Sequence, residues 1–198
     1  MRNRGIITGM ASCVALVAAM AWAASMTVGQ TAPAFTLTDQ NGKSVSLSDY
    51  AGKLVVLEWF NDGCPFVQRH YNDGDMNATA KAYAAKGVVW LAINSTHSAS
   101  ASSDKSIADK WSIDRPILSD TNGTVGHAYG ATNTPEIFVI GKDGKIDYFG
   151  AIDNNPQGDK SASEVTNYVA RALDEVLAGK PVSEPQTKPY GCSVKYAS

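Results

Sequence analysis

The sequence has no run of basic residues, no glycine-rich phosphate loop and few cysteines, three in 198 residues. Without clustered lysine or arginine it carries no electrostatic footprint for nucleic acid, so no nucleic-acid partner is expected. No carboxylate pair of glycosidase type and no Ser/His/Asp order of a hydrolase is present. The histidines lack the spacing of metal ligands, so neither a metal nor a cofactor is predicted. They are His70, His97 and His127.

An apolar run long enough to cross a bilayer of about 30 Å is missing as well. The apolar segment 14–20 is short, follows Arg2 and Arg4, and precedes a small-x-small site at residues 21–23. This pattern predicts a signal peptide over residues 1–23, and a mature protein in the periplasm or secreted, without a transmembrane anchor. A lipid anchor at Cys13 is a minor alternative, because the apolar run follows that cysteine instead of preceding it.

Loss of the first 23 residues removes two arginines and no acid from 17 basic and 19 acidic residues, which leaves a net charge near −4. Roughly 175 residues remain, enough for one domain with a core of its own. Only Cys64 and Cys192 stay in the mature chain. In an oxidising compartment such a pair is either a structural disulfide or a redox-active pair, and the cysteine count leaves both open.

The hydrophobic pattern alternates between strands and helices. A hairpin over 35–47, a domain over 24–178 and an extended, proline-containing arm over 179–198 are predicted. The fold class is α/β, with a mixed central sheet flanked by helices and an N-terminal hairpin. Strands are expected at 54–60, 88–94, 117–118, 135–140 and 146–149, and helices at 65–71, 78–86, 104–111, 125–129 and 164–177.

Cys64 follows the most apolar of these strands and precedes Pro65, which suits the first position of a helix. At a helix N-terminus the unpaired N–H groups favour a thiolate over a thiol, and the thiolate is the form that attacks disulfides or peroxides. Gly63 and Pro65 favour an exposed turn over a buried cysteine. Cys64 is therefore predicted to be the nucleophile.

Residues 31–178 resemble the thioredoxin-like redoxin superfamily, which includes AhpC/TSA, peroxiredoxin-like and thiol-disulfide oxidoreductase proteins. The segment VVLEWFNDGCP at 55–65 is similar to its strand and nucleophile, and YGATNTPEIFVI at 129–140 to the segment that carries its cis-proline. CPFV-x-x-HY at 64–71 and the tail PYGCSVKY at 189–196 resemble a bacterial exported group within it.

The resemblance implies a thioredoxin-like fold and a cis peptide between Thr134 and Pro135. Thr134 and Pro135, with Pro65, would then bind the substrate beside Cys64. The resemblance also implies that Glu58, six residues before Cys64, is a buried acid that passes a proton to the attacking thiol. A carboxylate in that apolar strand is expensive to bury ionised, and a hydrogen-bonded structural carboxylate is an equal alternative.

The sequence departs from the motifs of both peroxiredoxins and thioredoxin. Leu57 and Asn61 stand where peroxiredoxins carry proline and threonine, and Val67 stands where thioredoxin has its second cysteine. Cys192 remains as the resolving partner if the arm brings it back to Cys64. We therefore expect an exported thiol-disulfide oxidoreductase that acts on protein thiols or disulfides, or on a hydroperoxide, and uses an external thiol reductant. The alternatives are a slow thiol peroxidase and a binding domain with a structural disulfide.

Overall fold

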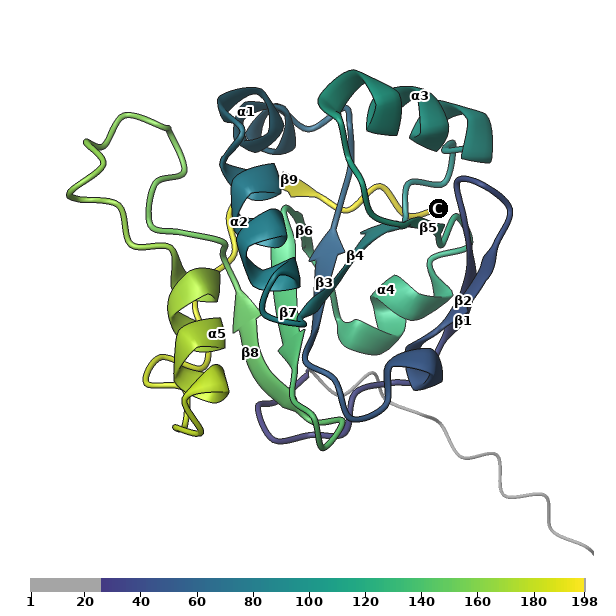
Figure 1. Cartoon of the computed structure of the whole chain (residues 1–198). Helices are drawn as coiled ribbons and strands as arrows, with labels where there is room; N and C mark the ends of the chain where they lie inside the picture. The colour runs from purple at the N-terminus through teal and green to yellow at the C-terminus, as the bar shows by residue number, and fades with distance from the viewer. Residues whose placement is uncertain (1–25, 198) are drawn as a thin grey trace, which may run out of the picture.

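A seven-stranded mixed sheet forms the centre of the protein, whose computed structural model describes residues 26–197 (Figure 1). The predicted signal peptide lies outside these residues. The spatial order is β2-β1-β5-β4-β3-β7-β8, with β3, β4 and β5 parallel and the other pairs antiparallel. The strands are β1 (Thr36–Asp39), β2 (Ser44–Ser46), β3 (Val55–Trp59), β4 (Val89–Asn94), β5 (Ile117–Ser119), β7 (Glu136–Ile140) and β8 (Ile146–Gly150).

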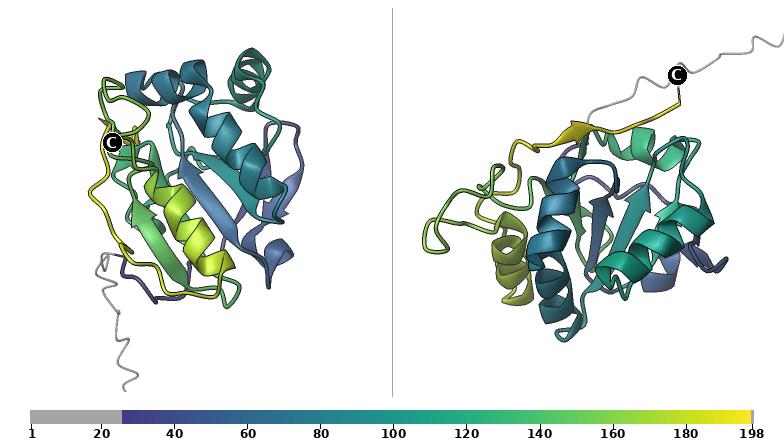
Figure 2. Two further views of the ribbon diagram at one scale, coloured as in Figure 1. Left: turned by 60° about the vertical axis from the view of Figure 1, so that its left-hand side comes forward. Right: turned by 90° about the horizontal axis from the view of Figure 1, so that it is seen from above.

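Helices cover both faces of this sheet. Figure 2 shows α1, α2, α3 and α5 on one face and α4 on the other. Within the described residues, no helix is long and apolar enough to cross a membrane. The helices are α1 (Pro65–Asp73), α2 (Asp75–Ala84), α3 (Ala101–Trp111), α4 (Thr124–Tyr129) and α5 (Tyr168–Leu177), with a 3-10 turn η1 at Leu47–Tyr50.

Strand β3 is buried along its whole length between β4 and β7, as its apolar sequence predicts. Because side chains alternate along a strand, Val56 packs into the core under α1, α2, α3 and α5, whereas Leu57 and Trp59 pack into the core under α4. The chain leaves β3 at its carboxyl end and begins α1 at Pro65. This is the edge of the sheet at which α/β proteins place their reactive groups.

The expected break after α1 is present. Gly74 has φ = 80°, a left-handed conformation that favours glycine, and it ends α1 just before α2 begins. Three helix starts differ from those predicted: α2 begins at Asp75 instead of residue 78, α3 at Ala101 instead of 104, and α5 at Tyr168 instead of 164. Asn167 caps α5 by accepting a hydrogen bond from the Ala170 N–H, and Thr166 pairs instead with Asn154.

The arm over 179–198 is extended in its described part, and it forms a strand that the sequence did not predict. It first runs beside β8, where the N–H of Thr187 donates to the carbonyl of Phe149. It then crosses the end of the sheet where β3 stops (Figures 1 and 2). There β9 (Cys192–Ser193) pairs antiparallel with the short strand β6 (Asn133–Thr134).

Candidate active site

Cys64 is the N-cap residue of α1, with Pro65 at the first helical position, as predicted. The turn is exposed at Gly63 and Pro65, as expected, but Cys64 itself is buried, at only 1% exposed. Its thiol donates to the carbonyl of Thr134 at 2.9 Å, and the arm lies across it. The glycine and proline beside Cys64 shape the turn, but a segment more than a hundred residues away decides its exposure.

Thr134 and Pro135 lie against Cys64, and the peptide between them is cis, as the resemblance implied. The hydroxyl of Thr134 is buried and has no hydrogen-bond partner among the described residues. It lies where it can donate to a Cys64 thiolate and so helps to lower the pKa of that thiol. Pro65 is exposed beside this pair and lines a surface hollow with Phe66 and Pro156.

Cys192 is the direct partner of Thr134 in the β6–β9 pairing, which brings the second thiol to the first. Both cysteines are free in this structure. Gly191 makes the approach possible: it has φ = 119°, and a Cβ there would lie 2.1 Å from the Thr134 carbonyl oxygen. The predicted closeness of Cys64 and Cys192 therefore depends on a glycine next to the cysteine.

The two thiols differ in acidity. Burial raises the pKa of Cys64, but hydrogen bonds from the Cys192 thiol, the Val67 N–H and Thr134 outweigh it, and the net pKa is lowered. Burial and the neighbouring Cys64 sulfur raise the pKa of Cys192 to about 11. Of the two thiols, Cys64 is thus the one whose pKa favours ionisation.

Glu58 is fully buried on β3, on the face under α1. Its carboxylate accepts hydrogen bonds from Tyr71 at 2.8 Å and Trp90 at 2.9 Å, and pairs with Arg115 at 3.3 Å. These are its hydrogen-bond partners among the described residues, and Cys64 is not one of them. The proton-transfer role stays a prediction, and the contacts are those of an anchor that ties α1 to the sheet.

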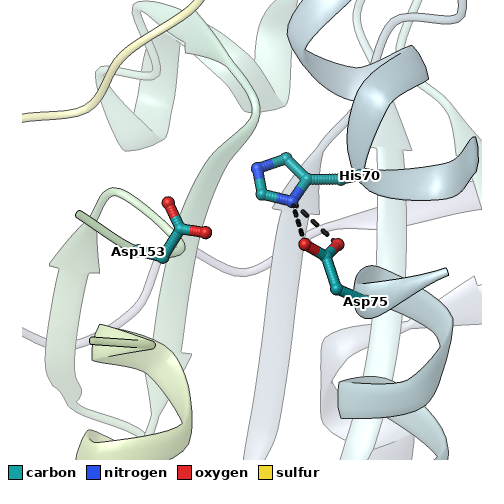
Figure 3. A group of neighbouring side chains, drawn as sticks. All are labelled: His70, Asp75 and Asp153. Atoms are coloured by element: carbon teal, nitrogen blue, oxygen red, sulfur yellow. Dashed lines mark hydrogen bonds and ion pairs between the residues drawn. The ribbon is translucent and has the colours of Figure 1, made fainter. Parts of the chain in front are cut away.

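Sequence reasoning missed His70, which it considered only as a possible metal ligand. His70 is fully buried at the end of α1, and its Nδ1 lies 2.8 Å from Asp75 at the start of α2 (Figure 3). Its Nε2 lies 2.8 Å from the hydroxyl of Tyr190 in the arm. The signal was present, since His70 belongs to CPFV-x-x-HY and Tyr190 to PYGCSVKY. Nothing local in either motif says that they meet.

His70, Asp75 and Asp153 also offer ligand atoms within 4.8 Å of one another, close enough to share a metal ion. The guanidinium of Arg69 lies 2.9 Å from the His70 Nε2, and Tyr190 donates to Asp153 at 2.5 Å. A cation would have to displace a positive charge and a bonded phenol. The cluster is satisfied as a hydrogen-bond network, and the prediction that no metal binds stays a prediction.

The AhpC/TSA family model matches residues 28–149, which include Cys64 and Pro135 but not Cys192. The chain is 34% identical over 122 residues to the thiol-disulfide oxidoreductase ResA of Geobacillus thermodenitrificans, covering 62% of this chain and 68% of the relative. It is similar to an uncharacterized conserved protein from Geobacillus kaustophilus, with 31% identity, a TM-score of 0.78, and 87% and 93% of the two chains covered.

A third likeness gives the fold a name. The thioredoxin domain of a thiol-disulfide oxidoreductase from Bacteroides vulgatus superposes with a TM-score of 0.54 at 25% identity, covering 62% of this chain and 86% of that domain. The described structure itself has a mixed central sheet, a cysteine at the start of α1 and a cis peptide between Thr134 and Pro135. The chain therefore belongs to the AhpC/TSA family, and it is an oxidoreductase with a thioredoxin-like fold.

Proposed function

We propose that the protein is an exported thiol-disulfide oxidoreductase in which Cys64 attacks and Cys192 resolves. The observation that carries this proposal is the pairing of Thr134 with Cys192, which supplies a second thiol to a nucleophile that has a lowered pKa. Cys192 thereby acts as the second cysteine, which in thioredoxin stands at the position of Val67. The activity printed for the ResA relative supports the reaction class.

The first step is attack of the Cys64 thiolate on one sulfur of a substrate disulfide. A bond forms between Cys64 and that sulfur, and the other substrate sulfur leaves as a thiolate. Cys192 then gives up its proton and attacks the Cys64 sulfur, which forms the Cys64–Cys192 disulfide and releases the second substrate thiolate. Two cysteines are oxidised and one disulfide is reduced, by two electrons.

An external dithiol reductant returns the pair to the reduced state. Cys192 is less buried than Cys64, so it offers the accessible sulfur of the oxidised pair. The same steps in reverse oxidise a substrate dithiol, and the potential of the pair decides the direction. Pro65 is exposed beside Cys64, whereas Thr134 and Pro135 are buried and Thr134 is paired with Cys192, so a substrate would reach those two residues only when the arm lifts.

Export is part of the proposal because of residues 1–23, which have the charge and apolar pattern of a signal peptide. Outside the cytoplasm thiols oxidise and disulfides persist. A reactive pair there requires a reductant, which is why the external thiol donor belongs to the proposed cycle. The partner is thus a thiol protein or a small thiol of the same compartment.

The burial of Cys64 favours a second candidate, a thiol peroxidase. A hydroperoxide is small enough to reach a sulfur that the arm covers more easily than a protein can. Cys64 would take the terminal oxygen to become a sulfenic acid and release the alcohol, and Cys192 would condense with it to give the disulfide and water. Asn61 removes the threonine hydroxyl that peroxiredoxins use, so we expect this reaction to be slow.

A trapping experiment tests the proposed roles. Cys192→Ser mixed with a disulfide substrate is expected to accumulate a mixed disulfide at Cys64, because the resolving thiol is gone. Cys64→Ser is expected to form none, and the wild type to end as the Cys64–Cys192 disulfide. Peptide mass measured under non-reducing conditions distinguishes the outcomes for the two variants and the wild type.

A redox titration of the wild type accompanies this experiment. A potential between roughly −120 and −270 mV is expected for an exchanger, whereas one below about −300 mV would mean a structural disulfide. Oxidation of Cys64 to a sulfenic acid by hydroperoxide, faster than any disulfide exchange, would favour the peroxidase.

The acidity of Cys64 gives a pH prediction. Cys192→Ala removes the thiol that donates to the Cys64 sulfur, so the pKa of Cys64 should rise. The alkylation rate of Cys64, followed against pH, should then reach its midpoint at a higher pH than in the wild type. Cys192→Ser keeps a donor and should move the midpoint less. Equal midpoints in all three proteins would show that Cys192 does not stabilise the thiolate.

Glu58→Gln separates the two roles of the buried carboxylate. If Glu58 is an anchor, the substitution leaves Arg115 buried without its counter-charge, and the free energy of unfolding should fall by about 3–5 kcal/mol. The double variant Glu58→Gln/Arg115→Met should regain part of that loss. The pH midpoint of Cys64 alkylation should stay at the wild-type value, and a shifted midpoint would return Glu58 to the proton-transfer role.

A further inference from the structure

We propose that four residues, Asp75, His70, Tyr190 and Asp153, form a latch that positions Cys192 on Cys64. The inference rests on the proposed resolving role of Cys192 and adds the residues that enable it. None of the four touches either sulfur, so they are positioning residues. Their joint effect is to hold the arm down at a point two residues before Cys192.

One half of the latch is built on the helix of the nucleophile. A carboxylate only accepts hydrogen bonds, so the contact of Asp75 with Nδ1 makes that nitrogen the donor and fixes the ring of His70. In the neutral ring Nε2 is then an acceptor, and it points to the arm. Arg69 donates to this nitrogen at 2.9 Å and to the carbonyl of Asn155 at 2.8 Å. The site is thus rigid on the α1 side.

The other half is the phenol of Tyr190. Its hydroxyl donates its one proton to Asp153 at 2.5 Å. Its oxygen lies 2.8 Å from the His70 Nε2 and accepts at 3.5 Å from Arg69, the same guanidinium that donates to Nε2, so Arg69 bridges the ring and the phenol. The ring packs on Phe66, with centroids 5.9 Å apart, and stacks on His70 at 6.2 Å. Asp153 is itself held, because it accepts from the N–H of Asn155 at 2.8 Å. Three separate parts of the chain therefore meet at one hydroxyl.

The spacing of the latch links it to the thiols. His70 follows Cys64 by six residues on α1, about 9 Å along the helix axis. Tyr190 precedes Cys192 by two residues, a reach of at most about 7 Å. Helix and arm are joined at the latch and meet again at the cysteines. A fixed Tyr190 therefore limits where Cys192 can go and raises its effective concentration at Cys64.

Tyr190→Phe is the main variant, because it keeps the ring packing and removes only the hydroxyl. In a glutathione redox titration, the equilibrium constant for the Cys64–Cys192 disulfide should fall about tenfold relative to the wild type, as expected for loss of a hydrogen bond to a charged group. Tyr83→Phe is the matched control: its hydroxyl donates to the Ala170 carbonyl at 2.7 Å, away from the arm, and it should leave the constant unchanged.

A second measurement follows the opening of the arm, and so the strength of the latch, without forming any disulfide. In a Cys192→Ser background, Cys64 is alkylated only when the arm lifts, so adding Tyr190→Phe should speed its reaction with iodoacetamide about tenfold. Asp153→Asn should act in the same direction and serves if Tyr190→Phe does not fold. Wild-type values in both measurements for both variants would overturn the latch.

The two proposals fail separately. If the wild type forms no Cys64–Cys192 disulfide in glutathione buffers, the resolving role is wrong, and the alkylation rates still show whether the latch holds the arm. If the disulfide forms and neither variant changes its constant or the alkylation rate, the resolving role stands and the latch is wrong.

Discussion

The antiparallel pairing of Thr134 with Cys192 is the contact on which the candidate active site depends. It brings a thiol from the end of the chain to one at the start of α1, and it covers Cys64 with the same strand. Two neighbouring residues support this contact. Gly191 leaves room for the Thr134 carbonyl, and the side chain of Asn133 donates to the carbonyl of Gly191 at 3.1 Å. A thioredoxin-like domain with a single local cysteine thereby acquires its second one.

The environment of the pair separates the roles of two chemically equal groups. Donors at the helix start, on Thr134 and on Cys192 lie where they stabilise a Cys64 thiolate, and their effect on its pKa outweighs that of burial. For Cys192, burial and the neighbouring Cys64 sulfur outweigh the nearby charge of Lys195, and its pKa is raised. The order of ionisation follows from placement, not from the residue type. The same placement also restricts access, because the strand that brings in Cys192 covers Cys64.

Much of the fold could be predicted because its signals are local. The apolar run of β3, the proline that starts α1 and the asparagine-glycine turn of the first hairpin each act over a few residues. The exposure of Cys64 and the meeting of His70 with Tyr190 could not, because each depends on the path of the arm. That path is set by contacts such as the Tyr148 hydroxyl with Thr187 at 2.6 Å, which no periodicity records.

The measurement that tests this account most directly is the rate of Cys64–Cys192 disulfide formation in Gly191→Ala. The added Cβ would lie 2.1 Å from the Thr134 carbonyl oxygen, so the strand pairing cannot persist unchanged. Gly179→Ala, at another positive φ with open space around it, is the control for backbone strain alone. The account predicts disulfide formation slowed at least about tenfold in Gly191→Ala but not in the control. Equal rates would contradict the claim that the pairing delivers Cys192.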